Sequence, residues 1–142
     1  MGFVVPIAER RKIIAGSFTS LKFDHRAPSG AILTRAFLGG MLQSAMMNLG
    51  DSELVAAARD EFRALLGLTA EPQMVEVRRW PDSMPQYEVG HLERVAAIER
   101  AAAELPNFAL AGAAYRGVGI PDVIHGAELA AESTFARLIA TP

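Results

Sequence analysis

The stretch that decides the fold runs from Leu110 to Glu128 and reads LAGAAYRGVGIPDVIHGAE. The apolar residues 108–111 overlap its start and form a run short enough for a buried strand. Glycines then punctuate residues 112–119, and glycine allows backbone angles and close approaches that a Cβ atom would forbid. Pro121 suits the first position of a helix, and apolar residues repeat at helical spacing over 124–138. The stretch therefore predicts a strand, a glycine-rich turn and an amphipathic helix.

The predicted turn ends at a helix N-terminus, which carries free backbone N–H groups and about half a positive charge. An anion or an electron-rich carbonyl binds well at such an end, so residues 118–122 are a candidate ligand site. An ordinary connection that packs a helix on a sheet would have the same pattern. The segment fails as a dinucleotide-binding fingerprint, because Asp122 replaces the third glycine. The residues alone leave both interpretations open and name no reaction.

The composition indicates a folded protein and excludes several kinds of chemistry. The chain has 142 residues, of which 51% are hydrophobic and 21% charged, as in globular domains. It has no cysteine, which excludes disulfides, a thiol nucleophile and thiolate metal ligands. Its histidines lack metal-ligand spacing, its net charge is −2 and its arginines are scattered, so we expect neither a metal site nor nucleic-acid binding. No apolar stretch approaches the length of a transmembrane helix.

The segments before the deciding stretch predict a sheet followed by helices. Runs rich in β-branched and aromatic residues, separated by turn residues, indicate an antiparallel meander. These runs are residues 2–7, 12–23 and 31–38. Helical periodicity follows Asp51, a good N-cap, and ends at Gly67; a second helix is expected over 91–105, and alternation over 73–79 predicts another strand. The fold class is therefore α+β: an antiparallel sheet with packed helices, followed by an α-β-α segment.

Several motifs resemble one family of flavoenzymes. The segment MPQYEVGH at 84–91, followed by ERV at 93–95, resembles the MPQY-x-x-GH segment of protoporphyrinogen and coproporphyrinogen oxidases. The stretch LAGAAYRGVGIPDVIHGA at 110–127 resembles the family's C-terminal signature that contacts FAD, at the expected spacing. GFVVP, KIIAGSF and TRAFLGG follow the family's order nearer the N-terminus. The resemblance covers nearly the whole chain.

The resemblance implies an FAD-binding domain and a substrate domain, similar in plan to monoamine oxidases. Such enzymes oxidise a porphyrinogen to a porphyrin in haem biosynthesis, and dioxygen reoxidises the flavin. Residues 1–87 would be a remnant of the substrate domain, and 88–142 the C-terminal α-β-α part of the FAD-binding domain. The positions that fall where the family contacts FAD are Trp80, Ala113, Val118, Gly119 and Ile120. The resemblance assigns no catalytic residue and no metal ligand.

The family's chains are much longer, and their N-terminal part carries the fingerprint that holds the ADP half of FAD. We therefore expect this chain to be a C-terminal fragment whose partner is that N-terminal half. FAD should be absent or weakly bound, and the isolated chain inactive. Exposed strand edges and an apolar helix face should favour a homo-oligomer. We expect a cytoplasmic location, with peripheral membrane contact of the parent left open. The alternatives are a fragment of another amine-oxidase-type flavoenzyme and a non-catalytic, self-associating module.

Overall fold

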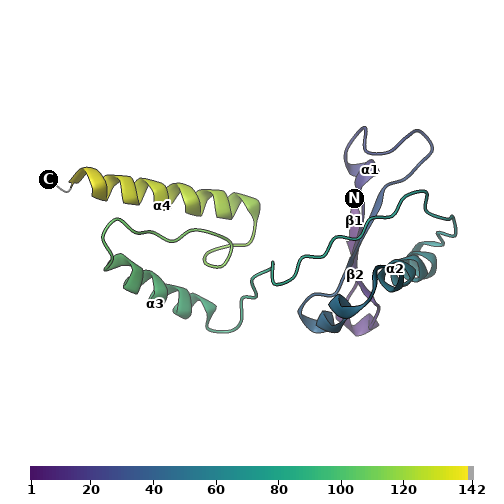
Figure 1. The fold of residues 1–142 in the computed structure, drawn as a ribbon, viewed down its shortest axis with the longest axis horizontal. Coiled ribbons are helices and arrows are strands. Elements are labelled where there is room, and N and C mark those ends of the chain that lie inside the picture. The colour runs from purple at the N-terminus through teal and green to yellow at the C-terminus, as the bar shows by residue number, and fades with distance from the viewer. Residues whose placement is uncertain (141–142) are drawn as a thin grey trace. The chain divides into compact units, whose positions relative to one another are not determined.

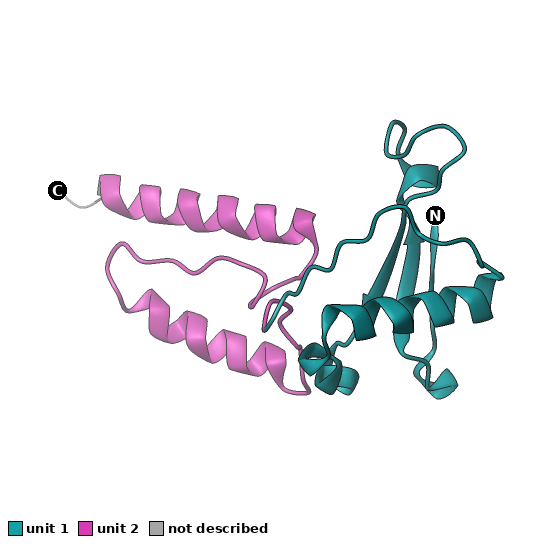
Figure 2. Ribbon diagram, turned by 45° about the vertical axis from the view of Figure 1, so that its right-hand side comes forward, with its two compact units in different colours: residues 1–81 teal, residues 82–142 magenta. Residues whose placement is uncertain are grey.

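The structure is a computed structural model that describes residues 1–140. The chain divides into two compact units, unit 1 from Met1 to Pro81 and unit 2 from Asp82 onward (Figure 2). All sheet structure of the described residues lies in unit 1, whereas unit 2 contains the two C-terminal helices (Figure 1). The α+β class and the antiparallel sheet expected from the sequence are confirmed.

Unit 1 is built on a three-stranded antiparallel sheet in the order β1-β2-β3. The strands are β1 (Gly2–Val4), β2 (Ile13–Phe18) and β3 (Thr34–Leu38), with the 3-10 turn η1 (Ile7–Glu9) between the first two. The predicted strand over 12–23 is too long, because the chain leaves β2 at Phe18 and forms one helical turn, α1 (Thr19–Lys22). The β2–β3 register is irregular between Ile13 and Ala15, where one extra residue forms a bulge.

One face of this sheet is covered by α2 (Asp51–Leu66), which the 3-10 segment η2 (Met41–Asn48) precedes. The register pairs Phe3 with Gly16, and a Cβ atom on Gly16 would lie 2.5 Å from the Phe3 ring and 3.2 Å from the Phe62 ring. The close packing of sheet and helix therefore depends on a glycine at this position. Gly67 ends α2 in the left-handed conformation, as predicted, whereas the N-cap is Gly50 rather than Asp51.

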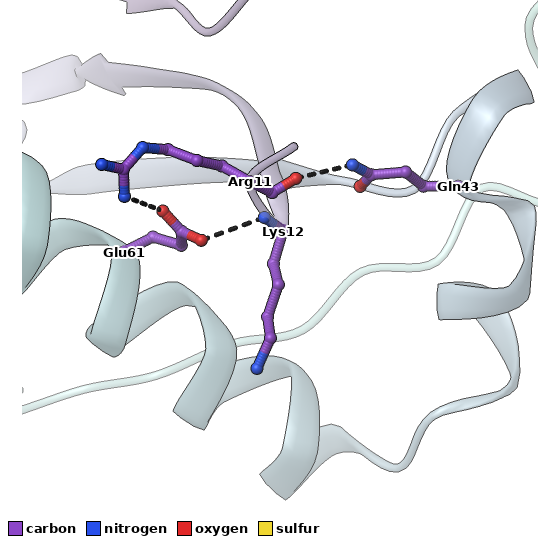
Figure 3. A network of polar contacts seen from close by, with 4 residues as sticks. All are labelled: Arg11, Lys12, Gln43 and Glu61. Atoms are coloured by element: carbon purple, nitrogen blue, oxygen red, sulfur yellow. Dashed lines mark hydrogen bonds and ion pairs between the residues drawn. The ribbon is translucent and has the colours of Figure 1, made fainter. Parts of the chain in front are cut away.

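A buried carboxylate fastens the start of β2 to α2 (Figure 3). Glu61 of α2 is 9% exposed and accepts hydrogen bonds from the Lys12 backbone N–H and from the Arg11 guanidinium, both at 3.0 Å. The Gln43 side chain of η2 donates to the Arg11 carbonyl at 2.6 Å. Because the carboxylate receives both a charged and a backbone donor, its burial is compensated.

Unit 2 consists of an irregular segment over 82–90, α3 (His91–Ala103), α4 (Ile120–Ala140) and the loop between the two helices. The strand predicted over 108–111 is wrong, and so is the one over 73–79: both segments lack strand structure. A strand requires a neighbouring backbone to receive its hydrogen bonds, and no strand of the described chain pairs with either segment. Unit 2 buries few side chains, and none of the described helices is long and apolar enough to cross a membrane.

Candidate functional site

The loop between α3 and α4 is the part of unit 2 that the sequence marks as functional. It turns at Gly112, whose φ of 124° lies in the region that favours glycine. The Tyr115 N–H donates to the Gly112 carbonyl at 3.3 Å and closes the turn. The loop ends at Gly119, whose carbonyl accepts the first bond of α4 from Val123 at 3.0 Å. The helix thus begins at Ile120, one residue before the predicted proline.

Two aromatic side chains hold this loop by its carbonyl oxygens, and we call them the clamp: Tyr87 and His91. The Tyr87 hydroxyl donates to the Ala113 carbonyl at 2.6 Å, and His91 Nε2 lies 2.8 Å from the Tyr115 carbonyl. The two rings stack with centroids 3.8 Å apart and planes 12° from parallel. A carbonyl only accepts, so His91 Nε2 carries the proton. His91 is 9% exposed, so this contact is formed largely out of solvent.

An ion pair makes a third attachment of the loop to α3. The Arg116 Nε donates to Glu99 Oε1 at 2.9 Å, and a second guanidinium nitrogen contacts Glu99 Oε2. The hydrogen bond from Arg116 holds the pKa of Glu99 below its ordinary value, and the same contact raises the pKa of Arg116. Both side chains are substantially exposed, so this pair contributes less than the clamp.

The two glycines before α4 lie against the side chain of Asp122. A Cβ atom on Gly117 would lie 2.5 Å from Asp122 Cβ, and one on Gly119 would lie 2.9 Å from Asp122 Oδ2. Both separations are shorter than real Cβ contacts. A side chain at Gly117 would displace the loop or the aspartate, whereas at Gly119 the end of the Asp122 side chain would only have to turn away. Asp122 therefore packs against the loop backbone in the first turn of α4, where a negative charge complements the helix dipole.

Four of the five predicted cofactor contacts lie in this loop or at the first residue of α4: Ala113, Val118, Gly119 and Ile120. Val118 and Ile120 are exposed by 47% and 77%, whereas Ala113 and Gly119 are half-buried. Among residues 1–140, no hydrogen bond uses the backbone N–H groups of Val118, Gly119 or Ile120. The fifth, Trp80, belongs to unit 1 and is 73% exposed.

The spacing of the histidines excluded His91 as a metal ligand and indicated no other role for it, and Tyr87 entered only as part of the MPQYEVGH segment. In the structure, both side chains form hydrogen bonds that hold the loop between α3 and α4. Their spacing of four residues was the available signal, but Tyr87 precedes α3, so helical periodicity does not apply to it. Ring stacking and the two carbonyl contacts follow from the tertiary arrangement of unit 2.

Comparison with known proteins assigns the chain to a family of flavin enzymes. Residues 5–134 match the family of flavin containing amine oxidoreductases, and the chain belongs to this family. The chain is 42% identical over 126 residues to a coproporphyrinogen III oxidase of Propionibacterium freudenreichii subsp. freudenreichii, covering 87% of this chain and 24% of that one. It is 36% identical over 124 residues to a coproporphyrinogen III oxidase of Bacillus subtilis (strain 168), covering 87% of this chain and 26% of that one.

A solved structure supports the same family assignment. A candidate protoporphyrinogen oxidase from Exiguobacterium sp. 255-15 superimposes with a TM-score of 0.80 at 31% identity, over 95% of this chain and 30% of the other. The chain thus spans about a quarter of the length of the curated relatives named above. Its family is one of FAD-dependent oxidoreductases.

Proposed function

We propose that this chain provides the clamped cofactor loop and part of the substrate domain of an FAD-dependent porphyrinogen oxidase. The clamp is the observation that carries the proposal. It joins the MPQYEVGH segment to the loop at 112–119, so the two motifs that resemble the porphyrinogen oxidases form one structural unit. The names of the two relatives described above support the same substrate class.

The loop has the donors that a flavin requires. Tyr87 and His91 engage carbonyl groups, and the backbone N–H groups from Val118 to Ile120 stay available at the start of α4. Backbone donors and a helix N-terminus stabilise an electron-rich edge without reorganisation. We infer that Ala113, Val118, Gly119 and Ile120 contact FAD, with Trp80 as a further contact. FAD, when bound, accepts the hydride equivalents removed from the porphyrinogen and passes them to dioxygen.

We further propose that residues 1–87 belong to the substrate domain and 88–142 to the FAD-binding domain. The compact units divide near this point, between Pro81 and Asp82, which supports the assignment. Under this proposal the isolated chain is inactive, because the flavin site and the substrate cleft require the N-terminal part that the longer relatives contain. FAD binding by the isolated chain should be weak. We also expect a cytoplasmic location, which the absence of cysteine supports.

Self-association of the isolated chain is a related proposal. In unit 2 several large apolar side chains of α4 are more than half exposed: Ile120, Ile124, Leu129, Phe135, Leu138 and Ile139. Such a helix face favours association with another apolar surface. We expect a homodimer or larger species in sedimentation velocity, with a sedimentation coefficient that rises with concentration. A sedimentation coefficient that corresponds to a monomer and does not change with protein concentration would contradict self-association.

A chimera tests the proposed function directly. The matched quarter of the Propionibacterium oxidase is replaced with this chain, and oxidation of coproporphyrinogen III is followed by porphyrin fluorescence. We expect the chimera to bind FAD and to oxidise coproporphyrinogen III. The isolated chain should bind FAD weakly and should not oxidise the substrate. Gly119→Val in the chimera should weaken FAD binding, whereas Gly126→Ala, in α4 with open space around its Cβ, should not. A chimera that holds FAD, by its visible spectrum, without oxidising the porphyrinogen would refute the proposal.

A further inference from the structure

The clamp holds main-chain peptide groups, and it thereby sets the direction of two backbone N–H donors. Tyr87 holds the Ala113 carbonyl at 2.6 Å, and His91 holds the Tyr115 carbonyl at 2.8 Å. A peptide group is planar, so a hydrogen bond to its carbonyl oxygen fixes the direction of the whole group. The two clamp rings are stacked and His91 is 9% exposed, so the clamp side chains are themselves well positioned.

The peptide that Tyr87 holds is the one whose direction a turn leaves least determined. The hydrogen bond from the Tyr115 N–H to the Gly112 carbonyl closes a β-turn, and the peptide between Ala113 and Ala114 is its centre. Type I and type II turns differ by reversal of this central peptide, and a type II turn requires a positive φ at its third residue. That residue, Ala114, does not have a positive φ. The Tyr87 hydroxyl therefore stabilises one of two orientations that a turn can adopt.

Both held peptides direct their N–H groups away from the clamp. The described residues contain no cis peptide bond, and in a trans peptide the N–H points opposite to the carbonyl. The carbonyls of Ala113 and Tyr115 face the clamp. The N–H of the same peptide, that of Ala114 or of Arg116, therefore points away from it. Both of these residues are exposed, and within the described part of the chain neither N–H donates a hydrogen bond.

The side of the loop away from the clamp thus presents two backbone donors and neither held carbonyl. Such a surface suits electron-rich oxygen atoms, which FAD carries on its pyrophosphate and on its flavin ring. Donors that are already oriented stabilise these oxygens without reorganisation, whereas a carbonyl oxygen in the same place would repel them. Loss of the clamp would allow either peptide to rotate and to present its carbonyl. The clamp therefore keeps acceptors away from this side as well as holding donors on it.

We propose that Tyr87 and His91 are positioning residues for FAD, which direct the N–H groups of Ala114 and Arg116 toward electron-rich oxygens of the cofactor. The proposal rests on the proposed function, in which this loop contacts FAD. It adds two side chains that act on the cofactor through the backbone that they hold, without touching it.

The test uses the chimera described above, freed of flavin and titrated with FAD. Tyr87→Phe removes the hydroxyl and keeps the ring, and it should weaken FAD binding about three- to tenfold, as expected for one net hydrogen bond. His91→Ala should weaken FAD binding at least as much, and His91→Gln, which keeps a side-chain N–H donor, should recover part of the affinity.

Thr134→Val is the matched control, because it removes the same kind of hydrogen bond elsewhere in unit 2. The Thr134 hydroxyl donates to the main-chain carbonyl of Ala130 at 2.8 Å, within α4 and outside the loop. This variant should leave FAD affinity unchanged. Weakening of FAD binding by Thr134→Val equal to that by Tyr87→Phe would overturn the positioning role, because it would show a general loss of stability.

The reduction potential of the bound flavin, measured by equilibration with a reference dye, shows which oxygens the donors face. A more negative potential in Tyr87→Phe would place the donors at the flavin ring, whose reduced form carries more negative charge. A tenfold larger loss of affinity for reduced than for oxidised FAD corresponds to about 30 mV. Weaker binding of FAD at an unchanged potential, with recovery in His91→Gln, would place the donors at the pyrophosphate. Either result supports the positioning role.

The results separate this proposal from the proposed function. The chimera could bind FAD and oxidise coproporphyrinogen III while Tyr87→Phe and His91→Ala bind FAD as tightly as Thr134→Val. That outcome would overturn the positioning role and leave the porphyrinogen oxidase function standing. A chimera that binds no FAD would overturn the proposed function and the positioning role together.

Discussion

Replacing His91 with alanine should release the loop at 112–119, and the size of the effect follows from the contacts. The change removes the hydrogen bond to the Tyr115 carbonyl and the stacking on the Tyr87 ring. A hydrogen bond of this kind is worth about 1 kcal/mol, an unsatisfied buried carbonyl costs about 1–2 kcal/mol, and an aromatic stack adds about 0.5–1.5 kcal/mol. These terms overlap, so we expect a local destabilisation of about 2–4 kcal/mol.

Amide hydrogen exchange read by mass spectrometry measures this release. A destabilisation of about 2–4 kcal/mol corresponds to exchange roughly 30- to 1000-fold faster in loop peptides that exchange by local opening. His125→Ala is the matched control, because the His125 side chain is 71% exposed and, among residues 1–140, forms an ion pair only with Glu128, at 3.9 Å. His91→Gln, which keeps a side-chain N–H donor, should recover part of the protection. Equal exchange in His91→Ala and His125→Ala would refute the role of the clamp.

Three further predictions concern single positions. Glu61→Ala should destabilise unit 1 by about 2–4 kcal/mol in urea unfolding, because it leaves a guanidinium and a backbone N–H at the start of β2 without their acceptor; an unchanged midpoint would contradict the network. The folded pKa of Glu99 is lowered by Arg116, so the pair's stabilisation is present above the ordinary value of 4.5 and is lost as pH falls through the lower folded pKa. Glu99→Gln should therefore flatten the acid limb of a stability–pH curve measured by thermal unfolding, and an unaltered limb would count against the pair. Gly117→Ala should cost about 1–3 kcal/mol through overpacking against the facing aspartate. Gly126→Ala, with open space around its Cβ in α4, should instead stabilise by about 0.5–1 kcal/mol; similar midpoints for the two glycine variants would contradict the packing argument.

The sequence predicted correctly those elements that depend on short-range patterns of residues. The meander, the helices and the glycine C-cap at Gly67 follow from alternation, periodicity and turn residues. The strands over 73–79 and 108–111 could not be predicted, because a pattern of apolar residues does not reveal whether another backbone pairs with them. A segment forms a strand only where a neighbouring strand is present to pair with it, and the segment's own residues do not show this.

The candidate site was predictable as a loop and not as a set of contacts. The glycines at 112–119 predicted a turn, and the resemblance of this stretch to a known signature implies that the turn contacts FAD. Tyr87 and His91 attach the turn through the carbonyl groups of Ala113 and Tyr115. These contacts join residues that are far apart in the sequence, so no local pattern predicts them.

The clamp grips the loop by main-chain oxygens, and this has a consequence for how the chain tolerates change. Ala113 and Tyr115 contribute carbonyl groups that every amino acid possesses, so the identity of their side chains is not what holds the loop. Sequence drift at such positions leaves the attachment intact, whereas Gly112, Gly117 and the two gripping rings have no equivalent substitute. As far as attachment of the loop is concerned, substitutions should therefore be tolerated where the backbone carbonyl makes the contact, and poorly tolerated where a side chain, or the absence of one, makes it.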